Sequence, residues 1–104
     1  MSDAQQLAVS FRIDPEHPAL PGHFPGRPVV PGVVLLDRVA AAIVAWKQVC
    51  IVGLPQVKFL RPLLPGEEAM LHLESAAQGI RFHISHDGAT IASGQMEIAV
   101  GETA

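Results

Sequence analysis

The sequence is poor in residues on which several classes of function depend. Its 104 residues include a single cysteine, Cys50, no tyrosine, one tryptophan and four phenylalanines. One cysteine excludes an internal disulfide and a thiolate-rich metal centre, and so few aromatic rings offer no stacking platform for nucleic-acid bases. The formal net charge is −3, without a basic cluster, so we do not expect binding to nucleic acid.

Targeting signals and long apolar runs are lacking as well. Residues 1–6 have neither the basic start nor the apolar stretch of a signal peptide. The most apolar stretch, residues 29–46, is interrupted by Asp37 and Arg38, and it is too short and too charged to span a bilayer. Together with the lone cysteine, these features lead us to expect a cytoplasmic protein that does not bind a membrane.

What the chain does contain is a large share of apolar residues for its size. Hydrophobic residues make up 49% of it and charged residues 16%. The length suits one domain over residues 1–104, in which residues 1–7 are expected to be flexible. A chain this small buries only a modest core by itself. We therefore expect an oligomer that covers the remaining apolar surface.

Hydrophobic patterning predicts one helix and about five strands. Residues 14–31 contain many prolines and can form neither a helix nor an inner strand. Residues 32–49 read as a helix that Gly53 follows, and because it is apolar on nearly every side we expect it to be buried. Strands are expected at residues 8–13, 51–60, 67–75, 80–85 and 90–100, with a tight turn at Asp87-Gly88. This is an α+β arrangement, an antiparallel sheet wrapped around one central helix.

The segment GHFPGRPVVPGV, residues 22–33, and the helix after it bring three reactive groups together. His23 lies in a stiff extended loop, where its protonation state can change near neutral pH. Gly32 opens the helix, with its N–H group at the positive end of the helix dipole. Asp37 lies about one and a half turns further on an apolar surface, where burial would favour the protonated acid.

A base, an acid and a backbone donor are what β-elimination beside a thioester requires. The base removes the proton from the α-carbon, and the acid protonates the departing β-hydroxyl group. Backbone N–H groups hold the negative charge that develops on the thioester oxygen. The reaction needs neither a metal nor an organic cofactor, and we expect none.

These residues resemble the motif of the FabA/FabZ-type 3-hydroxyacyl-acyl carrier protein dehydratases, which have the hot-dog fold. The 14 positions from His23 to Asp37 (37 − 23) are the family's spacing. The FabZ branch has Glu at this point and the FabA branch has Asp, so Asp37 is FabA-like while the loop is FabZ-like. The segment VKFLRPLLPGE, residues 57–67, resembles a further family segment, so the resemblance covers about residues 14–100.

The resemblance implies a role for each matching residue. His23 would be the catalytic base, and Asp37 would be its acid partner. Gly32 would supply an N–H group to the oxyanion and Val33 a second one, while the carbonyl group of Val29 would orient the histidine ring. No metal site is implied.

The resemblance also implies the substrate and the partners. The substrate would be a 3-hydroxyacyl thioester on acyl carrier protein, converted to the trans-2-enoyl thioester in fatty-acid or polyene-type biosynthesis. Arg27, Lys58 and Arg61 are candidate contacts for the acidic carrier protein, with a merely solvated face as the alternative. Because the family builds each site from two chains, we expect a homodimer in which His23 of one chain faces Asp37 of the other.

Departures from the family pattern keep other functions open. Ala41 stands where family members usually carry Gln, and the helix and strand that precede the motif in longer members are lacking. The second departure suggests a pared-down relative of the family. The segment LLDRV, residues 35–39, resembles the short dehydratase-like branch of aryl-polyene or xanthomonadin-type pathways. The alternatives are an acyl thioesterase of the same fold, in which the acid activates water, and a non-catalytic subunit that binds acyl carrier protein or pairs with an active paralogue.

Three further histidines fall in the region of the predicted strands, and we expect them to be surface residues. They are His72, His83 and His86. His83 and His86 lie on opposite faces of a strand, because side chains alternate along it. The histidines are therefore not expected to ligate a metal.

Overall fold

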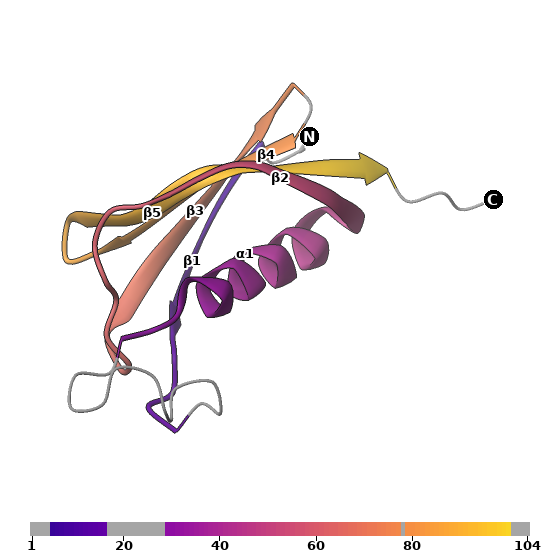
Figure 1. The fold of residues 1–104 in the computed structure, drawn as a ribbon. Coiled ribbons are helices and arrows are strands. Elements are labelled where there is room, and N and C mark those ends of the chain that lie inside the picture. Colours follow the sequence, from indigo (N-terminus) through magenta and orange to yellow (C-terminus); the bar gives the residue numbers. More distant parts are fainter. Residues whose placement is uncertain (1–4, 17–28, 78, 101–104) are drawn as a thin grey trace.

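The chain folds as a five-stranded antiparallel sheet with one helix against its face (Figure 1). The computed structural model describes residues 5–16, 29–77 and 79–100. Its elements are, in chain order, β1 (Gln6–Arg12), α1 (Gly32–Lys47), β2 (Val49–Phe59), β3 (Glu68–Ala76), β4 (Gly79–His86) and β5 (Ala89–Val100). The strand order in the sheet is β1-β3-β4-β5-β2, so β1 and β2 are the edge strands. The predicted α+β fold is confirmed.

The neighbouring inner strands β3 and β4 follow the predicted alternation. Leu71 pairs with Ile84, and Leu73 pairs with Phe82, which places four apolar side chains on the face that α1 covers. The turn from β4 to β5 is formed by Asp87 and Gly88, with φ values of 52° and 83°. Two positive φ values in a two-residue turn match the twist of a hairpin, which explains the Asp-Gly pair.

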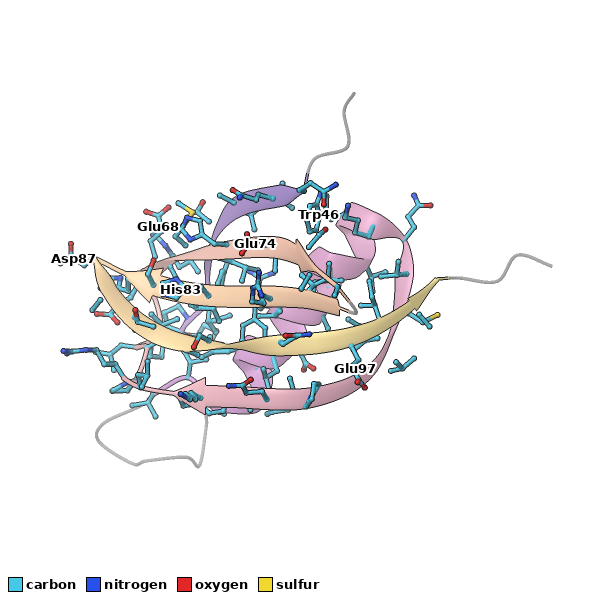
Figure 2. The ribbon with its side chains drawn as sticks, turned by 90° about the horizontal axis from the view of Figure 1, so that it is seen from above. Trp46, Glu68, Glu74, His83, Asp87 and Glu97 are labelled. Atoms are coloured by element: carbon cyan, nitrogen blue, oxygen red, sulfur yellow. The ribbon has the colours of Figure 1, made fainter. Side chains whose placement is uncertain are left out.

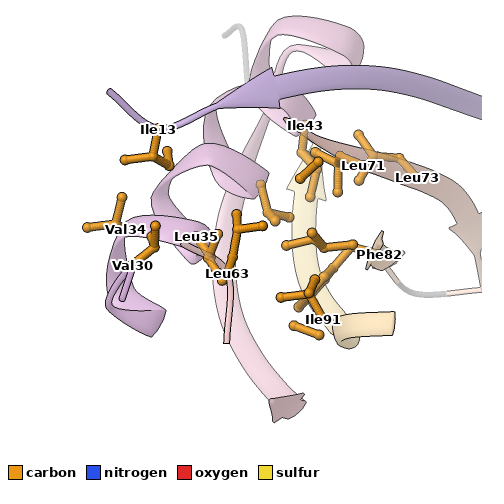
Figure 3. Close-up of a cluster of buried hydrophobic side chains, with 14 of the residues drawn as sticks. Ile13, Val30, Val34, Leu35, Ile43, Leu63, Leu71, Leu73, Phe82 and Ile91 are labelled. Carbon is orange, nitrogen blue, oxygen red and sulfur yellow. The ribbon is translucent and has the colours of Figure 1, made fainter. Parts of the chain in front are cut away.

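The hydrophobic core lies between α1 and the sheet (Figure 3). The helix contributes Val34, Leu35, Val39 and Ile43. Leu63, from the connection between β2 and β3, is fully buried among them. The side chains that the sheet contributes are Ala69, Leu71, Leu73, Ile80, Phe82, Ile84, Ile91, Ala92 and Met96.

Helix α1 is buried on the side that faces the sheet, as its apolar composition predicts, and not on every side. Its outer face is open in the single chain, where Val33 is 63% exposed and Val44 is 44% exposed. The physical reason is that one small sheet covers one side of a helix, and the described residues provide no second layer. Helix α1 does not have the length and apolar character that a membrane-spanning helix needs.

The end of α1 also differs from the expected one. The helix ends at Lys47, and Gln48 follows in the left-handed conformation with φ 56° and ψ 50°. The N–H group of Gln48 donates to the carbonyl oxygen of Val44 at 2.8 Å and caps the helix. Gly53, expected to mark the end of the helix, lies inside β2, beside a register irregularity with β5.

Candidate active site

Helix α1 begins at Gly32, directly after the extended Pro31. The carbonyl oxygen of Pro31 accepts hydrogen bonds from the N–H groups of Val34 and Leu35, at 3.0 and 3.4 Å. The N–H groups of Gly32 and Val33 have no acceptor within the helix, and they stand at the positive end of its dipole. The two residues predicted as oxyanion donors thus lie at the start of the helix, and their role stays a prediction.

The residues before the helix are tied to the connection between β2 and β3. The N–H group of Val30 donates to the carbonyl oxygen of Leu63 at 2.8 Å. Both side chains are buried, Leu63 completely. Val29, the predicted carbonyl partner of the histidine ring, is half-buried beside them. This backbone contact determines how the chain enters α1.

A pocket of about 410 Å³ opens where these segments meet the start of the helix. It is lined by residues 29–32, Leu35 and residues 59–63. Arg61 is the charged residue of this lining, and most of the others are apolar. A small apolar pocket beside free backbone donors suits a ligand with an apolar chain and one polar group.

The ring of Phe59 packs against Gly32 at the edge of this pocket. A Cβ atom at position 32 would lie 2.8 Å from Cζ of Phe59 and 3.0 Å from Cε1. These distances are shorter than an ordinary carbon–carbon contact of about 3.5 Å. Glycine is therefore needed at position 32 for the close approach of the ring, in addition to its place at the helix start.

Asp37 lies on the outer face of α1 and is exposed. It is four positions after Val33, on the same side of the helix, and it does not line the pocket at the helix start. The expectation that Asp37 is buried in an apolar setting is wrong for the single chain. The reason is that the apolar surface around Asp37 is itself uncovered, as the exposure of Val33 and Val44 shows.

The other predicted site residues divide into those that the structure describes and those that it does not. His23 and Arg27 lie outside the described residues. Lys58 and Arg61 are both exposed, at the end of β2 and just after it. Within the described part of the chain, the structure brings together Val29, Gly32 and Arg61 at one pocket.

Ala41 lies one turn beyond Asp37, and it borders a cavity of about 280 Å³ between α1 and β1. The cavity is lined by Val9, Ser10, Phe11, Arg38, Ala41, Ala42 and Leu71. The guanidinium group of Arg38 lies 5.5 Å from the centre of the Phe11 ring and donates to the carbonyl oxygen of Arg12 at 3.4 Å. A longer side chain at position 41 therefore has room beside the guanidinium group of Arg38, which these two contacts hold in place.

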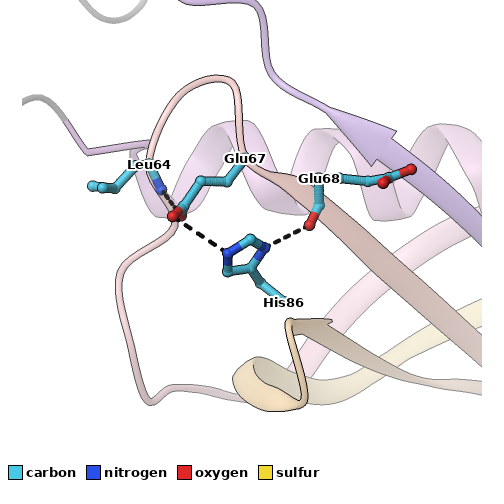
Figure 4. Close-up of polar contacts among 4 residues, drawn as sticks. All are labelled: Leu64, Glu67, Glu68 and His86. Atoms are coloured by element: carbon cyan, nitrogen blue, oxygen red, sulfur yellow. Dashed lines mark hydrogen bonds and ion pairs between the residues drawn. The ribbon is translucent and has the colours of Figure 1, made fainter.

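Sequence reasoning missed a polar network beneath the connection between β2 and β3 (Figure 4). Nδ1 of His86 lies 2.7 Å from the carbonyl oxygen of Glu68, and Nε2 lies 3.3 Å from the carboxylate of Glu67. The carboxylate of Glu67 also accepts a hydrogen bond from the N–H group of Leu64 at 2.9 Å. The hydrogen bond to the Glu68 carbonyl oxygen, followed by the charge of Glu67, raises the pKa of His86 above its ordinary value of 6.5.

The opposite face of the sheet has a larger groove that none of the predicted site residues lines. It measures about 650 Å³ and crosses all five strands, with largely polar side chains that include Glu74 and His83 (Figure 2). The ring of His83 faces His72 on the neighbouring strand, and its Nε2 lies 3.0 Å from Oγ1 of Thr90. Among the described residues, no cluster of three or more His, Cys, Asp or Glu side chains is arranged to hold a metal ion.

Comparison with known proteins identifies the family of the chain. The model of the ApeI-like family, described as ApeI dehydratase, matches residues 1–95. A 3-hydroxyacyl-[acyl-carrier-protein] dehydratase FabZ from Myxococcus xanthus is 31% identical over 107 residues, which cover 88% of this chain and 70% of that protein. The FabZ of Haemophilus influenzae is 35% identical over 82 residues, and these cover 69% of this chain and 55% of that protein. The chain thus spans about half the length of this second relative.

Solved structures agree with this assignment. The dehydratase heterocomplex ApeI:P from Xenorhabdus doucetiae matches with a TM-score of 0.83 at 25% identity, over 95% of this chain and 92% of that chain. The R-hydratase PhaJ1 from Pseudomonas aeruginosa matches with a TM-score of 0.74 at 16% identity, over 99% of this chain and 84% of that one, and shows the fold alone. The predicted hot-dog fold and the FabZ-type resemblance are confirmed, and the chain belongs to the ApeI-like dehydratase family.

Proposed function

We propose that this chain dehydrates a 3-hydroxyacyl thioester carried on acyl carrier protein and releases the trans-2-enoyl thioester. The observation that carries the proposal is the pocket at the start of α1, because it combines an apolar lining with the free N–H group of Gly32. In a chain of the dehydratase family, this is the arrangement that holds an acyl thioester by its carbonyl oxygen.

The proposed reaction divides the proton transfers between two side chains. His23 takes the proton from the α-carbon, and the electron pair of that C–H bond becomes the new double bond. The C–O bond at the β-carbon breaks, and Asp37 gives its proton to the departing hydroxyl group, which leaves as water. The N–H group of Gly32 donates to the thioester oxygen while that oxygen carries negative charge, and Val33 is the candidate for a second donor.

A second copy of the chain is proposed to complete each site. Asp37 does not line the pocket in one chain, and the outer face of α1 carries exposed valines around the acid. The edge strand β2 also has exposed apolar side chains at Val52 and Leu54, and such an edge favours pairing with another strand. A homodimer would bring His23 of one chain to Asp37 of the other.

Other features support the proposed partner and location. Arg61 is exposed in the lining of the pocket, and Lys58 is exposed one residue before Phe59, which also lines it. Both cations would meet the acidic surface of a carrier protein. The proposed location is the cytoplasm. The thiol group of Cys50 is free and exposed, which is compatible with that reducing compartment. The structure from Xenorhabdus doucetiae is a heterocomplex. A related subunit in place of the second copy is therefore the alternative, and the mass of the native complex distinguishes the two.

One substrate trial tests the proposed function. The purified chain is incubated with a 3-hydroxyacyl thioester of a carrier protein, and the products are followed by mass spectrometry and by thiol titration. Loss of water with an intact thioester supports the dehydratase. Release of free thiol would support the thioesterase instead. If neither product forms, the chain is a binding subunit, and mass measurement of the native complex from cells then identifies its partner.

A further inference from the structure

The connection between β2 and β3, residues 60–67, joins the proposed site to three other parts of the fold. The N–H groups of Leu60 and Arg61 donate to the carbonyl oxygen of Ile91 at 2.8 and 3.2 Å, and that of Gly66 donates to Ile13 at 2.9 Å. The carbonyl oxygen of Leu63 accepts the N–H group of Val30. This connection, called the β2–β3 turn below, therefore supports the backbone that leads into Gly32.

The two ring nitrogens of His86 both face hydrogen-bond acceptors (Figure 4). Nδ1 faces the carbonyl oxygen of Glu68, and Nε2 faces the carboxylate of Glu67. A neutral imidazole carries a hydrogen on only one nitrogen, so its other nitrogen would present a lone pair to an acceptor. Both contacts are made together only by the protonated imidazolium ring.

The charges around His86 favour that protonated ring. They come from Glu67 in the β2–β3 turn and from Asp87 in the hairpin. Glu68 of β3 contributes its carbonyl oxygen, while its carboxylate lies 3.9 Å from the guanidinium group of Arg12 on β1. The side chains of His86 and Glu67 are 30% and 32% exposed, so the proton on the ring exchanges with solvent and follows the pH.

We infer that Glu67 and His86 are positioning residues for the proposed dehydration. The imidazolium ring of His86 holds Glu67, and Glu67 holds the N–H group of Leu64 at the centre of the β2–β3 turn. Through the adjacent carbonyl group of Leu63, the turn holds Val30 and hence the start of α1. The inference rests on the proposed function, because it assigns these contacts to the placement of the oxyanion donor of Gly32.

The sign of the pH dependence follows from the direction of the shift. The pKa of His86 is raised in the folded chain, so the stabilisation is complete below its ordinary value of 6.5. It is lost as the pH rises through the raised pKa, because the ring then keeps one of its two contacts. We expect the oxyanion segment to be held best on the acidic side and to loosen on the alkaline side.

Three variants test the inference by the pH profile of kcat. In Glu67→Gln, the amide oxygen still accepts from Leu64, and the amide nitrogen donates to the neutral His86 ring, so the turn stays held on the alkaline side, where the wild-type turn loosens. In His86→Asn, the amide reaches the Glu68 carbonyl oxygen in place of Nδ1 but not Glu67. The control His83→Asn removes a histidine of the same strand that contacts Thr90 and not the turn.

At each pH, kcat of a variant is divided by kcat of wild type, which cancels every titration that the proteins have in common. His86→Asn lowers kcat about tenfold on the acidic side, as a displacement below 1 Å would, changes KM less than twofold, and approaches wild type as the pH rises. For Glu67→Gln the ratio of kcat to wild type rises with pH. For His83→Asn it stays at one. Equal pH profiles for His86→Asn and His83→Asn would overturn the inference.

Amide hydrogen exchange separates this inference from the proposed function. Protection factors of the Leu64 and Val30 amides need no substrate. We expect both to fall at least fivefold in His86→Asn relative to His83→Asn below the pKa of His86, and to differ less above it. Unchanged protection overturns the inference even in an active dehydratase. Altered protection in a chain without dehydratase activity would instead refute the proposed function. It would still establish that His86 and Glu67 hold the β2–β3 turn.

Discussion

The contact between Gly32 and Phe59 allows a sharp prediction for Gly32→Ala. The new methyl group would lie 2.8 Å from Cζ of Phe59, so the ring and the methyl group have to move apart by about 0.7 Å (3.5 − 2.8) to reach an ordinary contact distance. The backbone at position 32 is helical and accepts any L-residue. The substitution therefore tests the close approach at the pocket without straining the main chain.

Two effects on stability oppose each other in this variant. Inserting a methyl group into a packed site costs about 1–3 kcal/mol, and the lower end applies because Phe59 is 50% exposed and can swing into solvent. Alanine favours the helix over glycine by up to about 1 kcal/mol. The two terms nearly cancel, so we expect a melting temperature within about 5 °C of wild type.

The effect on turnover is larger than the effect on stability. The separation of about 0.7 Å is shared between the ring and the N–H group of residue 32. Because a shift of about 1 Å in a reacting group can cost a factor of about 100, a shift of the N–H group by about half of this 0.7 Å predicts a loss of about fivefold in kcat, or about 1 kcal/mol. The assay follows enoyl thioester formation together with thermal unfolding. Combining Gly32→Ala with Phe59→Leu removes the clash and should restore kcat to that of Phe59→Leu alone. Wild-type kcat in Gly32→Ala would refute the reasoning.

Three further predictions concern the acid and the base, position 41, and the arrangement of the acid and the base in a dimer. His23→Ala and Asp37→Asn should each lower kcat by about 10²- to 10⁴-fold, the usual contribution of a general acid or base, with unfolding curves close to wild type. Asp37→Glu should keep part of the activity. An unchanged rate in Asp37→Asn would make the acid structural. Ala41→Gln should keep or increase turnover, because position 41 is exposed and borders the cavity of about 280 Å³ beside Arg38; a collapse of the melting temperature would show that the cavity does not accept the amide. Mixing the two inactive variants, His23→Ala and Asp37→Asn, under subunit exchange should restore about a quarter of wild-type activity, because half of the dimers are mixed and each has one intact site; no recovery despite proven exchange would place both groups in one chain.

Most of the fold could be predicted because its signals are local. Alternation places Leu71 and Leu73 on one face of β3 whatever the rest of the chain does, and the Asp87-Gly88 pair satisfies a turn with two positive φ values. The start of α1 was predicted at Gly32 by its proline-glycine punctuation. The sequence also predicts that one small sheet leaves part of this apolar helix uncovered, but it does not show which layer provides the cover.

The parts of the site that could not be predicted depend on contacts between distant segments. The hydrogen bond from Val30 to Leu63 joins two backbone groups, which leave no signature in the side chains. The network of His86 arises because the pairing of β3 with β4 places the end of β4 beside the start of β3 and the turn before it. From the sequence alone, His86 was expected to be a surface residue like His83, and only the register distinguishes the two.

The exposure of Asp37 connects assembly to chemistry. A general acid delivers its proton best in a site from which water is excluded. Asp37 is exposed in the single chain, between the exposed side chains of Val33 and Val44. A second chain seated on this face would cover Asp37 and remove water from it. Association would then supply both the opposing histidine and the closed setting of the acid, which makes an active monomer incompatible with the proposed mechanism.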